Sequence, residues 1–250
     1  MNTREMYDEL KKAVKRTAPE KLALIDKPNQ ELVCVYPKSE LEKALEFTAW
    51  RIAQDFKGKN PIMLCLLNGA LMSYAYVATH LGNGFMMTMD YARPCSYHGD
   101  MTGGELEWKE KPHVDMTDRY VIIWDDIIDK ARTMRAAIDF CRAQKAAAVF
   151  TGVMLDKQCE RAPGCNIKPN YAALTVADYF VLGYGLDYAN LGRHWDGIYA
   201  IKTKTIGLEP SEQEPLSPHR SSASLFTKMD LTGDYIPLPE LADDQVRLSL

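Results

Sequence analysis

Three acidic residues follow an apolar run near the middle of the chain. Residues 120–124 are Tyr-Val-Ile-Ile-Trp, and Asp125, Asp126 and Asp129 come after them. The apolar run predicts a buried parallel strand, and residues 133–144 predict a helix with one apolar face. Ligands of open α/β sheets bind outside the carboxyl ends of the strands. We therefore expect the three carboxylates to lie at a binding site.

The turn between this strand and this helix has the residues of an anion site. Backbone N–H groups of residues 130–133, at a helix N-terminus, would cradle a phosphate. Arg132 and the hydroxyl group of Thr133 would add charge-assisted bonds. The preceding acid pair would accept hydrogen bonds from the vicinal hydroxyl groups of a ribose. The structural alternative is that Asp129 caps the helix and that the acid pair is merely solvated.

This run resembles the diphosphoribosyl-binding signature of the type I phosphoribosyltransferases, in which apolar residues, an acid pair, two apolar residues and Asp-Thr-Gly-x-Thr follow in order. Lys130 stands where Thr or Ser is usual, and Ala131 stands where Gly is usual. Alanine fits the cradle if its φ is negative and is strained there if its φ is positive. We expect the Lys130 ammonium group to point toward the 5′-phosphate or toward solvent.

The resemblance implies a role for each residue of the run. Asp125 and Asp126 would bind the ribose of diphosphoribosyl phosphate and help to hold Mg²⁺. Residues 130–133 would bind its 5′-phosphate. Asp129 would act as the general base that takes the N7 proton of a purine.

A second polar turn follows residues 62–67, which predict a core strand. Leu67, Asn68 and Gly69 resemble the pyrophosphate loop of purine phosphoribosyltransferases, where Leu-Lys-Gly or Leu-Arg-Gly is usual. The peptide between the first two residues can be cis in that family. Asn68 can bond a pyrophosphate oxygen but carries no charge. A simple turn between a strand and a helix is the alternative.

A third segment has the spacing Arg93-x-x-Ser96-Tyr97, which resembles the start of the mobile catalytic loop of the hypoxanthine-guanine family. Ser96 and Tyr97 would then contact substrate as the loop closes and excludes water. The alternative is an ordinary β-hairpin with a long tip.

Residues 178–188 are the second highly specific run. They resemble the segment Asp-x-Phe-Val-Val-Gly-Tyr-x-Leu-Asp-Tyr of the same family. The resemblance implies that Phe180 stacks on the purine and that the Val181 backbone reads the edge of the base. It also implies that Asp187 holds Mg²⁺ together with pyrophosphate.

Two basic residues take their roles from the same resemblance. Lys157 follows the apolar run 147–155 and would donate a hydrogen bond to the purine O6. Arg193 has the spacing of the family's pyrophosphate-binding arginine.

The periodicity of the chain predicts an α/β fold. We expect a mainly parallel, twisted sheet flanked by helices, which is the type I phosphoribosyltransferase fold. A small hood from residues 31–36 and about 160–207 would cover the carboxyl edge of that sheet. Further helices and strands are predicted at 3–16, from a Ser39–Glu42 capping box to about residue 56, and at 85–93, 106–110 and 196–202.

We expect three parts: an N-terminal extension over residues 1–30, the phosphoribosyltransferase domain with its hood over 31–207, and a C-terminal tail over 208–250. Proline and serine are frequent at the start of the tail, which is typical of a linker or a surface-wrapping segment.

The composition excludes several classes of protein. A net charge of −4 argues against a dedicated nucleic-acid binder. The longest apolar stretch, residues 146–155, is far too short to span a membrane. The first residues are charged and lack the apolar core of a signal peptide. The six cysteines form no C-x-x-C pair, so we expect reduced core thiols in a cytoplasmic protein.

The resemblance implies purine salvage. Hypoxanthine or guanine and diphosphoribosyl phosphate, with Mg²⁺, would give the nucleoside monophosphate and pyrophosphate, in a homo-oligomer (dimer or tetramer) without nucleic-acid or membrane partners. Two alternatives remain open. Asn68 and Lys130 suggest a non-catalytic nucleotide-binding regulator, and the tail suggests an interaction protein on the same fold.

Overall fold

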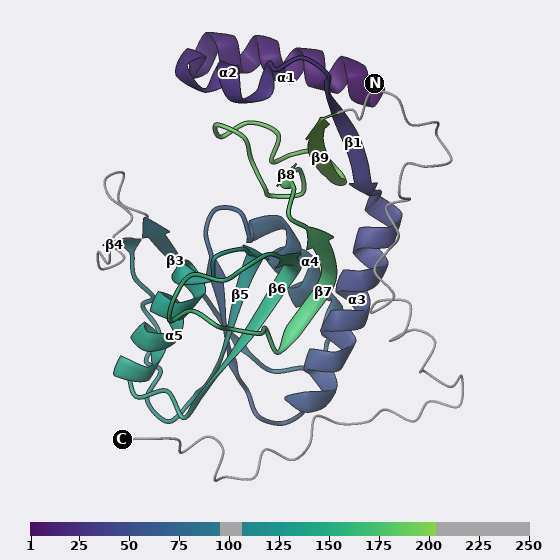
Figure 1. Ribbon diagram of the computed structural model, residues 1–250. Coiled ribbons are helices and arrows are strands. Elements are labelled where there is room, and N and C mark those ends of the chain that lie inside the picture. Colours follow the sequence, from purple (N-terminus) through teal and green to yellow (C-terminus); the bar gives the residue numbers. More distant parts are fainter. Residues whose placement is uncertain (96–106, 204–250) are drawn as a thin grey trace.

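A computed structural model describes residues 1–95 and 107–203 of the chain (Figure 1). In chain order, the elements of these residues are α1 (Thr3–Thr17), η1 (Pro19–Lys21), α2 (Leu22–Ile25), β1 (Gln30–Tyr36), α3 (Lys38–Asp55), β2 (Ile62–Leu66), α4 (Leu71–His80), β3 (Thr88–Cys95), β4 (Glu107–Glu110), β5 (Tyr120–Ile128), α5 (Arg132–Ala143), β6 (Ala148–Gln158), β7 (Tyr171–Ala177), β8 (Phe180–Leu182) and β9 (Ile198–Thr203). The predicted tail over 208–250 lies outside the described residues.

Two sheets organise the described residues. The large sheet has the strand order β4-β3-β2-β5-β6-β7, and all of its pairings are parallel except that of β3 with the edge strand β4. The small sheet has the order β1-β9-β8 and is antiparallel. The predicted fold class, a mainly parallel sheet flanked by helices, is confirmed.

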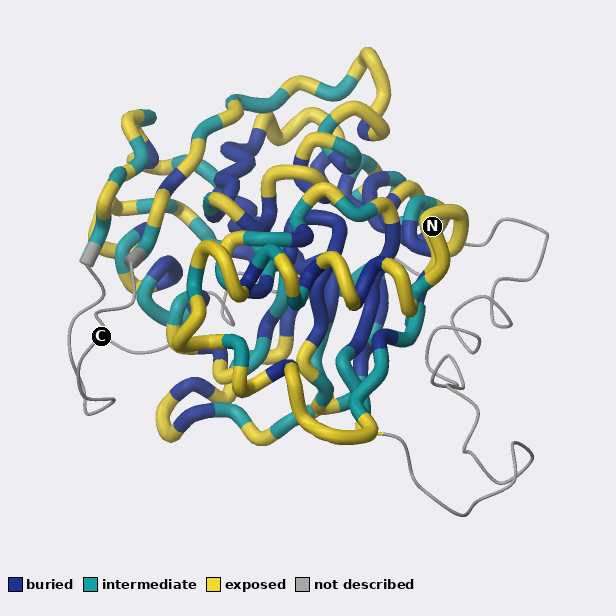
Figure 2. The backbone as a smooth tube through the Cα atoms, turned by 90° about the horizontal axis from the view of Figure 1, so that it is seen from above, coloured by how far each residue is buried: buried dark blue, intermediate teal, exposed yellow. Residues whose placement is uncertain are grey.

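Strand β2 is apolar along its whole length and β5 is apolar up to Trp124, as expected for strands with helices on both faces. In β2, Met63 and Cys65 point toward a core shared with α3 and α4. Leu64 and Leu66 point to the other face, where they pack in one cluster with Met134 and other residues of α5. Figure 2 shows the buried strands at the centre of the molecule, surrounded by exposed backbone.

Trp124 fixes the end of the apolar run in β5. Its ring is fully buried, and its indole N–H donates to the Ser73 hydroxyl group on α4 at 3.0 Å. A Cβ atom at Gly152 on the neighbouring strand would lie 2.5 Å from this ring, so only glycine leaves room for it. The carboxylates that follow Trp124 therefore start from a rigid position.

The N-terminal helices lie over the small sheet, at the end away from the large sheet (Figure 1). The predicted helix over residues 3–16 is confirmed as α1, and Met6, Leu10 and Val14 are buried on one face. They share an apolar cluster with Leu32 of β1 and Leu182 of β8. No helix within residues 1–95 and 107–203 is long and apolar enough to cross a membrane.

Three predicted elements were placed wrongly. Part of the predicted hood, β7, pairs with β6 in the large sheet instead. The predicted Ser39–Glu42 capping box is wrong, because the extended Pro37 leads directly into α3 at Lys38 and no side chain caps the helix. The strand predicted from residue 85 begins at Thr88, since the Phe85 N–H closes a turn on the Gly82 carbonyl.

Helix α5 begins from a left-handed residue. Ala131, the residue before its first turn, has φ 61° and ψ 11°. An L-residue in this conformation costs about 1–2 kcal/mol, and glycine avoids most of that cost. Of the two alternatives for Ala131, the structure shows the one with a positive φ, in which alanine is strained.

We predict that Ala131→Gly leaves the free energy of unfolding within about 0.5 kcal/mol of the parent value, because relief of the strain offsets the loss of a buried methyl group. The matched control is Ala137→Gly, which removes an equally buried methyl group from the interior of α5. This control should lose about 1–2 kcal/mol. Chemical denaturation measures both, and equal losses would show that Ala131 is unstrained.

Candidate active site

Eleven of the predicted site residues line one pocket at the carboxyl edge of the large sheet. The pocket has a volume of about 450 Å³ and lies where the loops after β2 and β5 meet the loop that follows β8. The predicted residues that line it are Leu67, Gly69, Asp125, Asp126, Asp129, Lys130, Ala131, Arg132, Thr133, Asp187 and Arg193. Asn68 is exposed and lies outside this lining.

The acid pair is partly buried and hydrogen-bonded rather than merely solvated. Asp125 accepts from the Asp126 N–H at 2.9 Å, and Asp126 accepts from the Ile127 N–H at 2.7 Å. Burial raises the pKa of Asp125 well above its usual range, and the neighbouring Asp126 raises it further. Burial also raises the pKa of Asp126. Two carboxylates in this environment favour a cation or a hydrogen-bond donor beside them.

Gly69 lies between strand β5 and the loop that follows β8. A Cβ atom there would lie 1.6 Å from the Asp126 carboxylate oxygen Oδ2. On its other side, a Cβ atom at Gly185 would lie 2.0 Å from the Gly69 carbonyl oxygen. Glycine at both positions lets the backbone approach this closely. The Leu67–Asn68 peptide before Gly69 is cis, the state that the resemblance allowed.

The predicted phosphate cradle, residues 130–133, lies at the start of α5. No side chain caps this helix, so the structural alternative in which Asp129 is a helix cap is wrong. The first N–H groups of α5 remain available to an anion. Lys130 is exposed, as one of the two predicted directions of its ammonium group requires, and its Nζ donates to the carbonyl oxygen of Glu160 at 3.0 Å.

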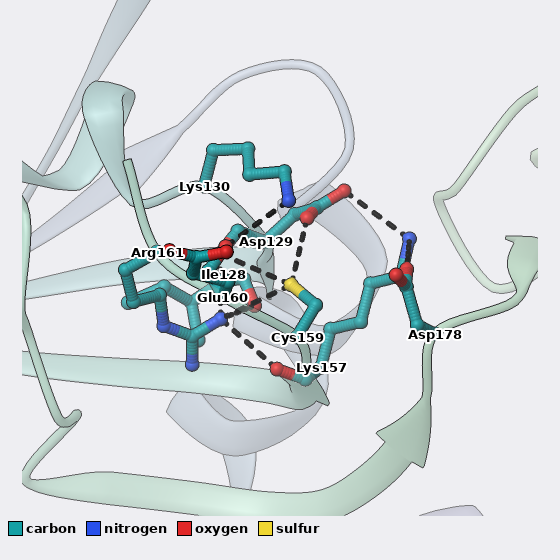
Figure 3. A network of polar contacts seen from close by, with 8 residues as sticks. All are labelled: Ile128, Asp129, Lys130, Lys157, Cys159, Glu160, Arg161 and Asp178. Carbon is teal, nitrogen blue, oxygen red and sulfur yellow. Dashed lines mark hydrogen bonds and ion pairs between the residues drawn. The ribbon is translucent and has the colours of Figure 1, made fainter. Parts of the chain in front are cut away.

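Asp129 belongs instead to a polar network with the end of β6 (Figure 3). Its Oδ2 accepts from the Lys157 Nζ at 3.2 Å, and its Oδ1 accepts from the Cys159 thiol at 3.0 Å. Burial alone would raise the pKa of Asp129, but the thiol and the Lys157 ammonium group outweigh it and lower that pKa. Asp129 is therefore ionised at neutral pH and able to accept a proton.

Lys157 lies between two carboxylates. Its Nζ is 3.2 Å from Asp129 and 3.0 Å from the Oδ1 of Asp178, and its side chain is 12% exposed. Burial lowers the pKa of Lys157, but the bonds to Asp178 and Asp129 raise it by more. Phe180 follows two residues after Asp178 and is 46% exposed, whereas Val181 is buried. These groups lie beside the pocket rather than in its lining.

Arg161 was missed by sequence reasoning. Its Nη1 donates to the carbonyl oxygens of Ile128 at 3.0 Å, Asp129 at 2.6 Å and Lys157 at 2.9 Å. Its Nη2 pairs with the Asp156 carboxylate. The guanidinium group thus ties the end of β5 to the end of β6 (Figure 3). Neither Arg161 nor Cys159 stands in a motif or a periodic pattern, so no sequence signal pointed to them.

Asp187 and Arg193 form an ion pair at 2.6 Å in the loop after β8. Arg193 also donates to the Gly185 carbonyl oxygen at 2.6 Å, and Asp187 accepts from the Asn190 N–H at 2.6 Å. Both side chains line the same pocket as the acid pair of β5. The pair places one positive and one negative group where a phosphorylated, metal-bound ligand would need both.

Within the described residues, no group of three or more acidic, histidine or cysteine side chains is arranged to hold a metal ion by itself. A cation in this pocket would therefore take most of its ligands from substrate phosphates and water. Asp125, Asp126 and Asp187 supply carboxylate oxygens to one cavity, and Mg²⁺ prefers a few carboxylates together with substrate phosphates. The predicted loop residues Ser96 and Tyr97 lie outside the described residues.

Comparison with known proteins identifies the family. Residues 35–189 match the model of the phosphoribosyl transferase domain. The hypoxanthine-guanine phosphoribosyltransferase of Streptococcus pneumoniae is 30% identical over 164 residues, which are 65% of this chain and 89% of that protein. The hypoxanthine-guanine-xanthine phosphoribosyltransferase of Tritrichomonas foetus is 26% identical over 168 residues, which are 67% and 90% of the two chains.

Solved structures agree. That of Trypanosoma cruzi hypoxanthine phosphoribosyl transferase has a TM-score of 0.64 and 25% identity, covering 68% of this chain and 91% of that one. A Bacillus anthracis hypoxanthine-guanine phosphoribosyltransferase has a TM-score of 0.63 and 26% identity, covering 70% and 100%. The chain therefore belongs to the phosphoribosyltransferase family and is an enzyme of that family.

Proposed function

We propose that this enzyme transfers the 5-phosphoribosyl group of diphosphoribosyl phosphate to a 6-oxopurine, hypoxanthine or guanine, and so acts in purine salvage. The observation that carries the proposal is the pairing of Lys157 with Asp129 at 3.2 Å beside a phosphate cradle. This pair presents a hydrogen-bond donor and a hydrogen-bond acceptor side by side.

The edge of a 6-oxopurine matches that pair. O6 is an acceptor, and the neighbouring N7 carries the proton that must leave when the base is ribosylated at N9. Lys157 would donate to O6, and Asp129 would accept the N7 proton. Once O6 shares the Lys157 ammonium group, less of its charge stabilises the Asp129 carboxylate. The pKa of Asp129 then rises, which favours transfer of the proton.

The rest of the pocket suits the phosphoribosyl donor. The start of α5 would bind the 5′-phosphate, and Asp125 and Asp126 would bind the ribose hydroxyl groups. As the bond from C1′ to pyrophosphate breaks and the bond to N9 forms, C1′ becomes positively charged, and the anionic surroundings stabilise it. Arg193 would bind the pyrophosphate that leaves.

We propose Mg²⁺ as the cofactor, held by Asp187 and the acid pair of β5, where it would neutralise the pyrophosphate leaving group. The names of the relatives support 6-oxopurines as substrates, with xanthine among them in one case. The described thiols of residues 34, 65, 141, 159 and 165 are free, which supports a cytoplasmic location. We also propose that the enzyme is a homo-oligomer.

Asp129→Asn should lower turnover about 10²–10⁴-fold, because an amide cannot take the N7 proton. The free energy of unfolding should change by less than about 1 kcal/mol, since the amide oxygen still accepts from Lys157 and Lys157 keeps Asp178. The matched control is Asp139→Asn, the same change on the exposed face of α5. Steady-state rates with hypoxanthine measure both, and a fully active Asp129→Asn enzyme would assign Asp129 a structural role.

Base choice tests Lys157. Adenine carries an amino group where hypoxanthine carries O6, so Lys157 would face another donor and could make no hydrogen bond to the base. We expect kcat/KM for adenine to be about 10⁴-fold below that for hypoxanthine or guanine. Lys157→Gln should weaken use of the 6-oxopurines and narrow this gap, whereas Lys168→Gln on an exposed loop should do neither.

A panel of hypoxanthine, guanine, xanthine and adenine with Mg²⁺ makes this measurement. Adenine turnover comparable to that of hypoxanthine would contradict the role of Lys157.

Calorimetry tests the alternative of a nucleotide-binding regulator, which Asn68 and Lys130 suggest. Binding of nucleoside monophosphate without turnover of any base would indicate such a regulator.

A further inference from the structure

The N-terminal segment lies outside the part of the chain that matches the family, yet it packs against residues inside that part. The family match covers residues 35–189, whereas α1, η1 and α2 end at Ile25. Met6, Leu10 and Val14 of α1 share one buried cluster with Leu182, Tyr188 and Tyr199 of the small sheet and its loop. The segment is therefore packed onto the small sheet, and the two together form the hood of this structure.

Tyr188 joins this segment to the loop that carries Asp187. Its side chain is 7% exposed, and its hydroxyl group donates to the carbonyl oxygen of Lys21, the last residue of η1, at 2.5 Å. Its backbone exchanges two hydrogen bonds with Leu191, at 3.0 and 2.9 Å. The ring is thus held at both ends, by its own loop and by the N-terminal segment.

The same ring contacts Phe180. The two ring centroids are 5.3 Å apart and the rings are nearly perpendicular, at 85°. This edge-to-face arrangement is a favourable one for aromatic pairs. Side chains alternate along β8, so Phe180 and Leu182 share the face toward the N-terminal segment, and Val181 belongs to the main core on the other face. With 46% of its surface exposed, Phe180 keeps room for a second flat ring.

We infer that Tyr188 is a positioning residue for base recognition, through which the N-terminal segment fixes the plane of the Phe180 ring. The inference rests on the proposed function, in which Phe180 stacks on the purine. A ring that is already oriented loses less conformational entropy when the base binds. The Lys21 carbonyl oxygen fixes the Tyr188 hydroxyl group, and the perpendicular contact with the Tyr188 ring fixes Phe180.

Two substitutions of Tyr188 separate the steps of this chain of contacts. Tyr188→Phe keeps the ring contact but loses the bond to Lys21, and it should raise the KM for hypoxanthine about 3–10-fold. Tyr188→Leu loses both contacts and should raise that KM further. The KM for diphosphoribosyl phosphate and kcat should each stay within about twofold in both variants, because neither contact touches the phosphate cradle.

Tyr7→Phe is the matched control. The Tyr7 hydroxyl group donates to the Ile25 carbonyl oxygen at 2.6 Å in the same buried cluster, but its ring packs under the Lys11 ammonium group. This control should lose stability as Tyr188→Phe does, and it should leave the KM for hypoxanthine within about twofold of the parent value. Thermal unfolding verifies that each variant is folded, and Tyr188→Phe carries the test alone if Tyr188→Leu does not fold.

The outcomes separate the inference from the proposed function. If the parent enzyme uses hypoxanthine and Tyr188→Phe changes its KM no more than Tyr7→Phe does, the inference is overturned and the proposed function stands. Equal rises in the KM values of both substrates would also overturn it, because Tyr188 would then act on the whole loop. If the parent enzyme neither uses a 6-oxopurine nor binds its nucleotide in calorimetry, both proposals fall.

Discussion

The parallel pairing of β5 with β6 is the constraint on which the site depends. Ile128 and Asp156 are partners in this register, so the next residue on each strand, Asp129 and Lys157, meets its counterpart at the carboxyl edge of the sheet. A slip of one residue would turn each apolar side chain of β5 to the opposite face of the sheet. Each face packs against its own set of helices, so that slip would disrupt both clusters. Burial of the central strands therefore also sets the 3.2 Å contact between Asp129 and Lys157. Arg161 holds the same two strand ends together by donating to the carbonyl oxygens of Asp129 and Lys157.

The remaining parts of the pocket are brought to this edge by close backbone contacts. Gly69 lies against the carboxylate of Asp126, and Gly185 lies against the carbonyl oxygen of Gly69. These two glycines therefore connect strand β5 to the loop that follows β8. The N-terminal segment covers the outer face of the small sheet. Its contact with Tyr188 extends the structural influence of that segment to the aromatic ring that would bind the base.

Local patterns predicted the sheet, the acid pair and the cradle, because each depends on residues that are adjacent in the sequence. The contact of Asp129 with Lys157 spans 28 positions and depends on strand register, so spacing alone could not show it. The role of Arg161 could not be predicted either, because it donates to backbone carbonyl oxygens, and every residue has one of those. The replacement of the usual glycine by Ala131 suggested possible strain, but only the backbone geometry showed that the φ angle of Ala131 is positive.

A double-mutant cycle on kcat/KM for hypoxanthine, with Asp129→Asn, Lys157→Gln and the two together, tests the central claim most directly. If the two residues form one recognition unit for the O6 and N7 edge, the double variant should have a kcat/KM only slightly below that of the less active single variant. The coupling energy between the two substitutions should then exceed about 1 kcal/mol. Losses that add fully would show that Asp129 and Lys157 act independently and would contradict the account.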